Sequence, residues 1–186
     1  MEQFNYAYLA GLIDGEGSFI IAMSPRKRKT GTYSIALYQW FTISQSHPDG
    51  KNLMEELNLW LTKEGIRSFL MTPIKNKFNN SLSYTLRIAH LDSLIKLCNR
   101  LNGKLILKQE ALANFLMVLQ IRKERRQKKP SLKGHKFPPF SKQCEEFYRT
   151  VAIIWDNFRG TLHHRLWKKS MEERLNEILD RKTLPK

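Results

Sequence analysis

Hydrophobic and polar positions change their spacing several times along the chain, and each change marks a predicted element. Residues 32–45 alternate cleanly, which is the period-two pattern of a long strand with one packed face and one more polar face. Other segments show apolar residues at helical spacing. The predicted strands cover 18–23, 32–45, 66–74 and 81–89, and the predicted helices cover 4–13, 52–64, 92–103, 108–127, 141–158 and 161–186.

The order of these elements predicts the architecture. Four strands in two hairpins, with helices on their apolar face, form an α+β fold with an αββαββα core and an antiparallel sheet whose other face is exposed. C-terminal helices follow. We expect one domain over residues 1–160, with 161–186 as a helical extension or tail. Asp92 is the predicted N-cap of the third helix, and Gly65 and Gly103 are predicted helix stops.

The first predicted helix ends in alternating acids and glycines. Asp14 and Glu16 alternate with Gly15 and Gly17, and a glycine just past the last turn is a typical helix stop. Acids are unfavourable there, because the C-terminus of a helix already carries about half a negative charge. Carboxylates beside unpaired carbonyls are ligands for a hard divalent cation. Small residues at four-residue spacing also give this helix one face that another backbone can approach closely: Ala7, Gly11 and Gly15.

Composition favours a nucleic-acid partner. The chain has 32 Lys plus Arg against 17 Asp plus Glu, a net charge of +15. Such an excess is typical of nucleic-acid binders, with a membrane-surface or generally basic protein as the alternative. No apolar run is long enough to span a membrane and no targeting pattern is evident, so we expect an intracellular protein without a membrane partner. Cys98 and Cys144 lack paired spacing, which fits a reducing compartment and argues against a zinc site.

Residues 9–19, LAGLIDGEGSF, resemble the signature of the LAGLIDADG homing endonucleases. In that family a helix packs against its twin and places a metal-binding acid at its end, within an αββαββα core. The resemblance implies a saddle-shaped DNA-binding sheet and cleavage of both strands across the minor groove, leaving short 3′ overhangs. It also implies that Glu16 is a metal ligand, that Gly15 contributes its carbonyl, and that Asp14 supports the metal site from the helix end. Asp is common at the position of Glu16, so the longer side chain changes the geometry rather than the role.

The sequence contains one copy of this signature, and one acid cannot hold the two cations that can drive phosphodiester hydrolysis. Two copies related by a two-fold axis can do so. We therefore expect a homodimer in which Ala7, Gly11 and Gly15 bring two Glu16 carboxylates close together. Mg²⁺ is the expected cofactor, and Mn²⁺ or Ca²⁺ would occupy the same site.

Members of the family with one signature also carry polar residues around the metals, and three positions here match them. Gln45 ends the second predicted strand, and Lys108 begins the helix after the second hairpin. The third, a basic residue after the glutamine, is best matched by Lys51, because the turn at 46–50 is one residue longer than usual. Taken alone, Gln45 would be a polar strand end and Lys108 a solvated lysine in a first turn.

The exposed face of the predicted sheet would contact DNA. Basic residues lie at the two hairpin tips, which suits phosphate contacts, and hydroxyl and aromatic side chains lie between them, which suits base contacts. An additional element covering Tyr38 and Trp40 is the alternative for those two. The predicted contacts are Arg26, Lys27, Arg28, Lys29, Ser34, Tyr38, Trp40, Thr42, Ser44, Ser68, Thr72, Lys75, Lys77, Ser83, Thr85 and Arg87.

These features predict a homodimeric, Mg²⁺-dependent DNA endonuclease of the intron-encoded homing type that acts on a long pseudo-palindromic target in double-stranded DNA. Two alternatives use the same basic sheet: a splicing cofactor (maturase) that binds intron RNA, and a DNA-binding regulator without catalysis. The basic segment 122–129 motivates the first alternative, and intact Glu16 argues against it; intact Glu16, Gln45 and Lys108 argue against the second. An enzyme of this type is expected in a chloroplast, a mitochondrion or a prokaryotic cytoplasm.

Overall fold

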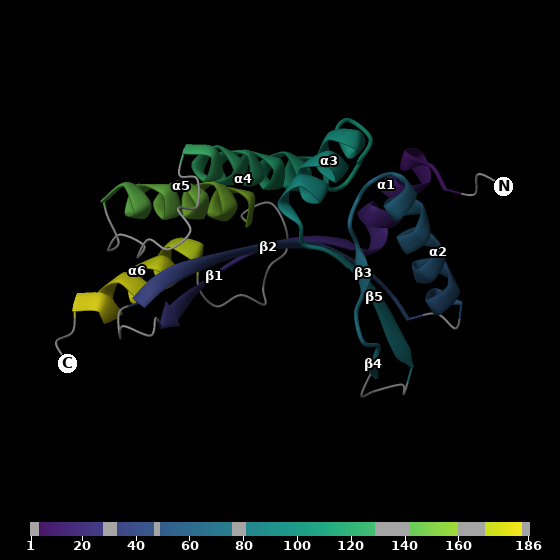
Figure 1. Ribbon diagram of the computed structural model, residues 1–186, viewed down its shortest axis with the longest axis horizontal. Helices are drawn as coiled ribbons and strands as arrows, with labels where there is room; N and C mark the ends of the chain where they lie inside the picture. The colour runs from purple at the N-terminus through teal and green to yellow at the C-terminus, as the bar shows by residue number, and fades with distance from the viewer. Residues whose placement is uncertain are drawn as a thin grey trace. The chain divides into compact units, whose positions relative to one another are not determined.

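The structure, a computed structural model, describes residues 4–27, 33–46, 49–75, 81–128, 142–159 and 170–183. Its elements follow the predicted αββαββα order and continue into C-terminal helices, so the predicted fold class is confirmed (Figure 1). The elements are α1 (Tyr6–Glu16), β1 (Gly17–Lys27), β2 (Tyr33–Gln45), α2 (Gly50–Lys63), β3 (Phe69–Leu70), β4 (Ile74–Lys75), β5 (Leu82–Ile88), α3 (Leu91–Leu101), α4 (Gln109–Lys128), α5 (Lys142–Arg159) and α6 (Met171–Thr183).

The described strands form a sheet in the order β1-β2-β5-β3, with β4 also paired to β5. The single strand predicted over 66–74 is wrong in detail, because this segment forms two short strands, β3 and β4. Pro73 explains the break, since it lies just before β4 and has no N–H to donate to a strand ladder. The N–H of Met71 still donates to the carbonyl of Thr85 at 2.8 Å, so the segment stays beside β5.

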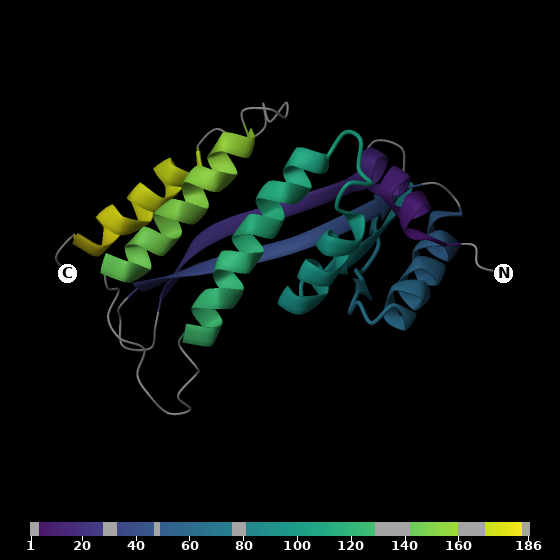
Figure 2. The ribbon, with the colours of Figure 1, turned by 90° about the horizontal axis from the view of Figure 1, so that it is seen from above.

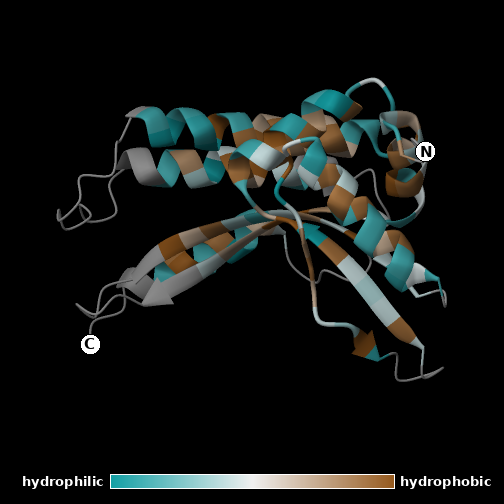
Figure 3. Ribbon diagram, turned by 45° about the vertical axis from the view of Figure 1, so that its right-hand side comes forward, coloured by the Kyte–Doolittle hydropathy of each residue, from teal (hydrophilic) through white to brown (hydrophobic). Residues whose placement is uncertain are grey.

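The two faces of the sheet differ as the alternation predicts. One face of β2 is buried, and on β5 Leu86 and Ile88 are buried while Ser83, Thr85 and Arg87 are not. Figure 3 shows hydrophobic (brown) and hydrophilic (teal) segments mixed along the long strands. The buried residues of the two strands are Ile35, Leu37, Gln39, Phe41, Ile43, Leu86 and Ile88.

The chain forms two compact units, and each has its own packing. In the first, α1, α2 and α3 lie on one side of the strands (Figure 1), and the ring of Phe19 lies 5.0 Å from that of Phe41 and 5.2 Å from that of Phe115. β1, β2 and α4 each have residues in both units, so the units do not divide the sequence at one position. The domain boundary expected at residue 160 therefore remains a prediction. The units are Met1–Ile20 with Gln39–Leu119, and Ile21–Tyr38 with Gln120–Lys186.

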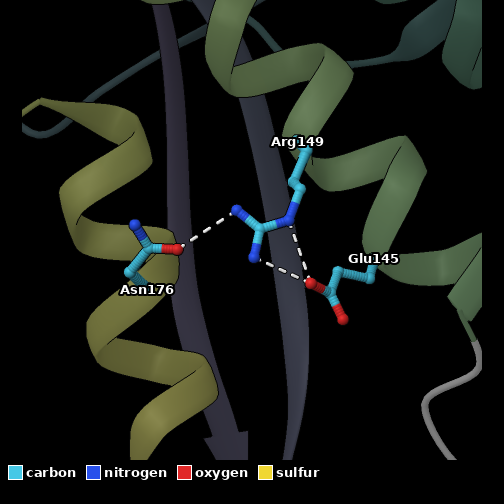
Figure 4. A network of polar contacts seen from close by, with 3 residues as sticks. All are labelled: Glu145, Arg149 and Asn176. Carbon is cyan, nitrogen blue, oxygen red and sulfur yellow. Dashed lines mark hydrogen bonds and ion pairs between the residues drawn. The ribbon is translucent and has the colours of Figure 1, made fainter.

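In the second unit α5 and α6 lie side by side (Figure 2). Arg149 of α5 joins them, because its guanidinium donates to Glu145 on its own helix and to Asn176 of α6 at 3.2 Å (Figure 4). Asp156 of α5 accepts hydrogen bonds from the first N–H groups of α6, which are otherwise unpaired. Within this unit, the Tyr148 hydroxyl of α5 donates to the backbone carbonyl of Ile35 in β2 at 2.8 Å.

Two predicted helix stops are confirmed and one predicted cap is wrong. Gly65 and Gly103 have φ values of 69° and 74°, the left-handed conformation that glycine adopts without a Cβ clash. His90 occupies the N-cap position of α3 with extended backbone, and Asp92 lies in the first turn, where an acid still favours the positive helix end. No helix in the described ranges is both long and apolar enough to span a membrane.

Candidate functional site

Helix α1 continues past the predicted end at Ile13 and finishes at Glu16. Asn5 begins it, since its side-chain oxygen accepts the N–H of Tyr8 at 2.8 Å. The predicted left-handed glycine stop is wrong, because Gly17 at the C-cap has a φ of −79°. Gly17 instead permits close packing: a Cβ there would lie 2.8 Å from the carbonyl oxygen of Ile13. Both acids of the signature therefore lie in the last helical turn.

Aromatic contacts anchor α1 to α2. The ring of Tyr6 lies 5.1 Å from that of Trp60, and its hydroxyl donates to the carboxylate of Glu64 at 3.0 Å. Burial, together with this hydrogen bond and the charge of Glu64, raises the pKa of Tyr6 to about 12. The orientation of α1 is thus fixed at its start by packing as well as by its buried side chains.

Asp14 is bound at both carboxylate oxygens by backbone N–H groups that precede α4. Its Oδ2 accepts from Ile106 at 2.7 Å, and its Oδ1 accepts from Leu107 at 3.2 Å and from Lys108 at 3.0 Å. Helix α4 begins at Gln109, and a helix start has unpaired donors and a partial positive charge. Asp14 therefore caps α4 from another helix.

The side chain of Lys108 binds the opposite helix end. Its Nζ donates to the carbonyls of Ile13 at 2.9 Å and Gly17 at 2.7 Å, with a longer contact of 3.5 Å to Gly15. A cation suits the C-terminus of a helix, and α1 has no basic residue in its own last turn. Burial lowers the pKa of Lys108, and the nearby carboxylates of α1 offset part of that shift.

Glu16 differs from both of these residues. Its side chain is exposed, and within the described ranges no hydrogen bond or ion pair satisfies its carboxylate. The same helix end thus has one acid with three N–H partners, Asp14, and one acid with none. Glu16 is the group at this site that remains available to a ligand.

These residues fit part of a divalent-cation site. The Glu16 carboxylate and the carbonyl of exposed Gly15 are hard oxygen ligands of the kind that Mg²⁺ and Ca²⁺ bind. Both oxygens of Asp14 already accept N–H groups, which suits a supporting role better than direct ligation. No group of three His, Cys, Asp or Glu among the described residues could hold a metal. The described residues at this helix end therefore supply only part of a ligand set.

One face of α1 is open. Its small residues are exposed, and a Cβ built on Gly11 or Gly15 would meet nothing within 4 Å. Next to this helix end Ile106 is 87% exposed and Leu107 is 73% exposed. Such a surface suits close approach of a second helix. The three predicted interface residues on this face are Ala7, Gly11 and Gly15.

Gln45 and Lys51 lie where β2 leads into α2. Gln45 is the last residue of β2, is half-buried, and lies opposite Tyr84 of β5. Lys51 lies in the first turn of α2 and pairs with Glu55 at 3.9 Å, with both side chains exposed. In the described part of the chain no hydrogen bond or ion pair links Gln45 or Lys51 to the end of α1, whereas Lys108 contacts it directly.

The open face of the sheet holds the polar residues predicted on β2 and β5. Register places Ser44 opposite Thr85 and Thr42 opposite Arg87, and the hydroxyls of the first pair are 2.8 Å apart. Trp40 lies two residues before Thr42 and so shares this face. The guanidinium carbon of Arg87 lies 5.1 Å from the centre of the Trp40 ring. Trp40 thus contacts an arginine of the neighbouring strand.

The sequence pattern predicts Ser68 on the DNA-binding face of the sheet, but the register of β3 places Phe69 there. Phe69 lies opposite Arg87 and therefore belongs to the open face, where it is 48% exposed. The hydroxyl of Ser68 donates to Asn58 of α2 at 2.7 Å, away from the predicted DNA contacts. Thr72 is exposed between β3 and β4. Adjacent apolar residues in this segment give no period-two signal, so the sequence alone could not assign the faces.

The basic hairpin residues are only partly within the described ranges. β1 continues to Lys27, so the backbones of Arg26 and Lys27 lie in a strand and not in the turn that the sequence predicts. The backbone of Ser34 lies in β2, and Lys75 is exposed on β4. The predicted contacts that lie outside the described residues are Arg28, Lys29 and Lys77.

Several exposed apolar residues were not anticipated. Residue type alone predicts burial for large aliphatic and aromatic side chains, so no sequence signal marks the ones that stay exposed. They lie on β3 to β5 and before α4. These residues are Phe69, Leu70, Ile74, Leu82, Ile106 and Leu107.

The chain is similar to known proteins both in sequence pattern and in fold. The model of the LAGLIDADG endonuclease family matches residues 9–118. No curated protein sequence matches the chain. The archaeal intron-encoded homing endonuclease I-Vdi141I, solved with DNA, has a TM-score of 0.67 and 19% identity, with 100% of each chain covered.

Two further structures are similar over nearly their whole length. I-CvuI, solved with the I-CreI target in the presence of Mg, has a TM-score of 0.64 and 14% identity, covering 97% of this chain and 96% of its own. I-TnaI has a TM-score of 0.60 and 17% identity, covering 96% of this chain and 98% of its own. At these identities the likeness concerns the fold.

Proposed function

The chain belongs to the LAGLIDADG endonuclease family, and we propose that it cuts both strands of a specific DNA sequence as a homodimer. The observation that carries this proposal is the unpartnered carboxylate of Glu16 at the end of α1. An acid at a helix C-terminus is unfavourable unless something offsets it, and Lys108 offsets it only in part, because its ammonium lies near Glu16 but makes no hydrogen bond or ion pair with it in the described chain. A bound cation would account for Glu16.

Mg²⁺ is the cofactor in this proposal, held by the Glu16 carboxylate and the Gly15 carbonyl of each copy, with Mn²⁺ or Ca²⁺ as substitutes. I-CvuI was solved with DNA in the presence of Mg and of Ca. Bound divalent cations would supply positive charge at the scissile phosphate and a water of lowered pKa. The Gly15 carbonyl could serve because its contact with Lys108 is the longest of the three that Lys108 makes.

A second copy would supply the missing ligands. The open face of α1 allows two helices to approach closely, which would bring the two Glu16 side chains to the two-fold axis. Exposed Ile106 and Leu107 lie beside the same helix end and would be covered in such an assembly. The residues assigned to the interface are Ala7, Gly11 and Gly15.

The remaining polar residues would hold the site and surround it. Asp14 and Lys108 tie α1 to α4, so they would keep Glu16 in place when DNA binds. The Lys108 ammonium would also add positive charge close to the scissile phosphate. Gln45 and Lys51 would order water around that phosphate from the junction of β2 and α2.

The open face of the sheet would bind the duplex. Lysines and arginines of the hairpins would contact phosphates, so affinity should fall steeply with salt. Two sheets in a dimer would span about two turns of DNA, which predicts a long pseudo-palindromic target. Cleavage would occur across the minor groove and leave short 3′ overhangs, and bending of the central base pairs would contribute specificity.

An in-vitro cleavage selection from a random duplex library with Mg²⁺ tests this proposal, together with a mass measurement by light scattering. We expect one enriched, pseudo-palindromic site, no cleavage with EDTA, and a particle of twice the chain's mass. Cleavage by a stable monomer would contradict the homodimer. Stimulation of splicing without any DNA cleavage would favour the maturase alternative.

A further inference from the structure

Arg87 has a defined place on the open face, on β5 between β2 and β3. Register aligns it with Thr42 on β2 and with Phe69 on β3, so these three side chains form one row across the sheet. Trp40 lies beside this row, with the guanidinium carbon of Arg87 5.1 Å from its ring centre. An aromatic ring at this distance attracts and orients a guanidinium group.

Arg87 has no acidic partner in the described part of the chain, and no hydrogen bond there satisfies its guanidinium. Its Nε is covered by protein and lacks an acceptor. The terminal nitrogens are therefore the donors that remain for a ligand. An arginine kept in this state contributes little to folding, since a covered donor without an acceptor is unfavourable.

We propose that Arg87 is a specificity-determining residue that reads a guanine in each half of the DNA target, and that Trp40 is a positioning residue that holds its guanidinium. This inference rests on the proposed function, and it assigns the recognition of one base in each half of the target to these two residues. Two parallel donors match the O6 and N7 acceptors of guanine in the major groove. A guanidinium already oriented by a ring loses less freedom on binding, which favours the correct base.

Its contact with the guanidinium of Arg87 distinguishes Trp40 from the other residues predicted to contact DNA. Tyr38 lies two residues away on the same face and is 48% exposed, yet no guanidinium of a described residue lies over its ring. Tyr38 therefore provides a matched control for loss of an aromatic ring. Thr42 and Phe69 flank Arg87 without holding it.

The test is a binding selection from a random duplex library in Ca²⁺, run in parallel for the wild type and Arg87→Gln, with circular dichroism to confirm folding. Binding reports base preference even for a protein that does not cut. We expect the wild type to require guanine at one position per half-site. Arg87→Gln should lose that preference by about ten- to a hundredfold at this position while the rest of the site stays the same.

A second measurement replaces the selected guanine by 7-deazaguanine, which lacks the N7 acceptor. The wild type should bind this duplex about tenfold more weakly, and Arg87→Gln should not distinguish the two duplexes. Uniform weakening on all sequences, with a smaller salt slope, would show that Arg87 contacts phosphate and would overturn the proposal.

Trp40 is tested by Trp40→Leu against Trp40→Tyr, with Tyr38→Leu as the control. The guanine preference should fall in Trp40→Leu and persist in Trp40→Tyr because a ring is retained. Tyr38 is itself a predicted DNA contact, so Tyr38→Leu is compared only for this preference at the selected position, which should persist, and not for overall affinity. Equal effects of Trp40→Leu and Tyr38→Leu would contradict the positioning role. A wild type that binds a specific site without cutting it defeats the endonuclease proposal alone, whereas a wild type that selects no sequence defeats both.

Discussion

Two polar regions of this protein have opposite hydrogen-bonding states. At the junction of α1 and α4, Asp14 accepts three backbone N–H groups and Lys108 donates to backbone carbonyls of the opposite helix end. On the open face of the sheet, Arg87 is oriented by Trp40 and has no acceptor in the described chain. Asp14 and Lys108 thus have their hydrogen-bond partners within the described chain, whereas Arg87 does not.

The difference separates residues that hold the structure from residues that await a ligand. A polar group with its partners in place contributes to folding, and its loss leaves other groups unpaired. A group without partners contributes little to folding and is free to bind something else. Glu16 lies at the junction of α1 and α4, but like Arg87 it has no hydrogen-bond or ion-pair partner in the described chain. For this reason we assign Glu16 to the metal.

The largest effect on stability is expected for Asp14→Ala. The substitution leaves three N–H groups before α4 without their acceptor, and at a partly exposed cap this should lower the free energy of unfolding by about 2 kcal/mol. Asp14→Asn retains an acceptor oxygen and should lose less. Urea denaturation measures both, and an Asp14→Ala protein as stable as the wild type would show that the cap is not needed.

Lys108→Met should lower the free energy of unfolding by about 1 kcal/mol, because α1 loses the cation at its C-terminus. Lys51→Met is the matched control. Lys51 is exposed and makes only a 3.9 Å pair with Glu55, so its loss should change the free energy by about 0.3 kcal/mol. Equal losses in the two variants would remove the distinction between a capping lysine and a surface lysine.

The two lysines and two acids also show how far the sequence predicts the site. The motif itself identifies Asp14, Glu16 and the helix before them. It does not identify the cap, because Lys108 reaches α1 from far along the chain and only the folded topology brings them together. For the same reason the predicted end of α1 at Ile13 was too early: Lys108 offsets the unfavourable end of a longer helix.

The fold was predicted more completely than the site, for a physical reason. Alternation over 32–45 is a property of local sequence, and so are the glycine stops at Gly65 and Gly103. The failures occur where local pattern is weak. Phe69 and Leu70 are both apolar and give no alternation, so the face of this strand could not be assigned. The break before β4 does have a local signal, Pro73, which the single strand predicted over 66–74 did not take into account.

A substitution on the open face of the sheet should affect DNA binding more than stability, whereas a substitution at the junction of α1 and α4 should affect stability. Arg87→Gln should change the free energy of unfolding by less than about 1 kcal/mol, because the group lost is a cation–π contact and no hydrogen bond is broken. Its effect should appear in DNA binding. Thermal denaturation of Arg87→Gln beside Asp14→Ala checks the contrast, and a destabilisation of Arg87→Gln equal to that of Asp14→Ala would contradict it.

The smallest expected effect is a pH dependence with two opposing contributions. The pKa of Lys108 is lowered in the folded state, so its contribution to stability rises with pH from that lowered value up to the ordinary lysine value near 10.4. The pKa of Tyr6 is raised to about 12, so its contribution is lost as pH rises from about 10 to about 12.

Substitution separates these contributions. Tyr6→Phe should remove the loss of stability between about pH 10 and 12, and Lys108→Met in that background should then remove the rise below it. Urea denaturation between pH 8 and about 12 measures both. An unchanged alkaline loss in Tyr6→Phe would mean that the hydrogen bond to Glu64 is not its source.

The assignment of Glu16 as the catalytic metal ligand is tested most directly by Glu16→Gln on one selected duplex, with cleavage measured in Mg²⁺ and binding measured beside it. Gln keeps the size of the side chain and removes its charge, and Glu16 makes no hydrogen bond or ion pair in the described chain whose loss would disturb folding. We expect cleavage to be abolished while specific binding stays within about twofold of the wild type. A Glu16→Gln protein that still cuts the site would contradict the account.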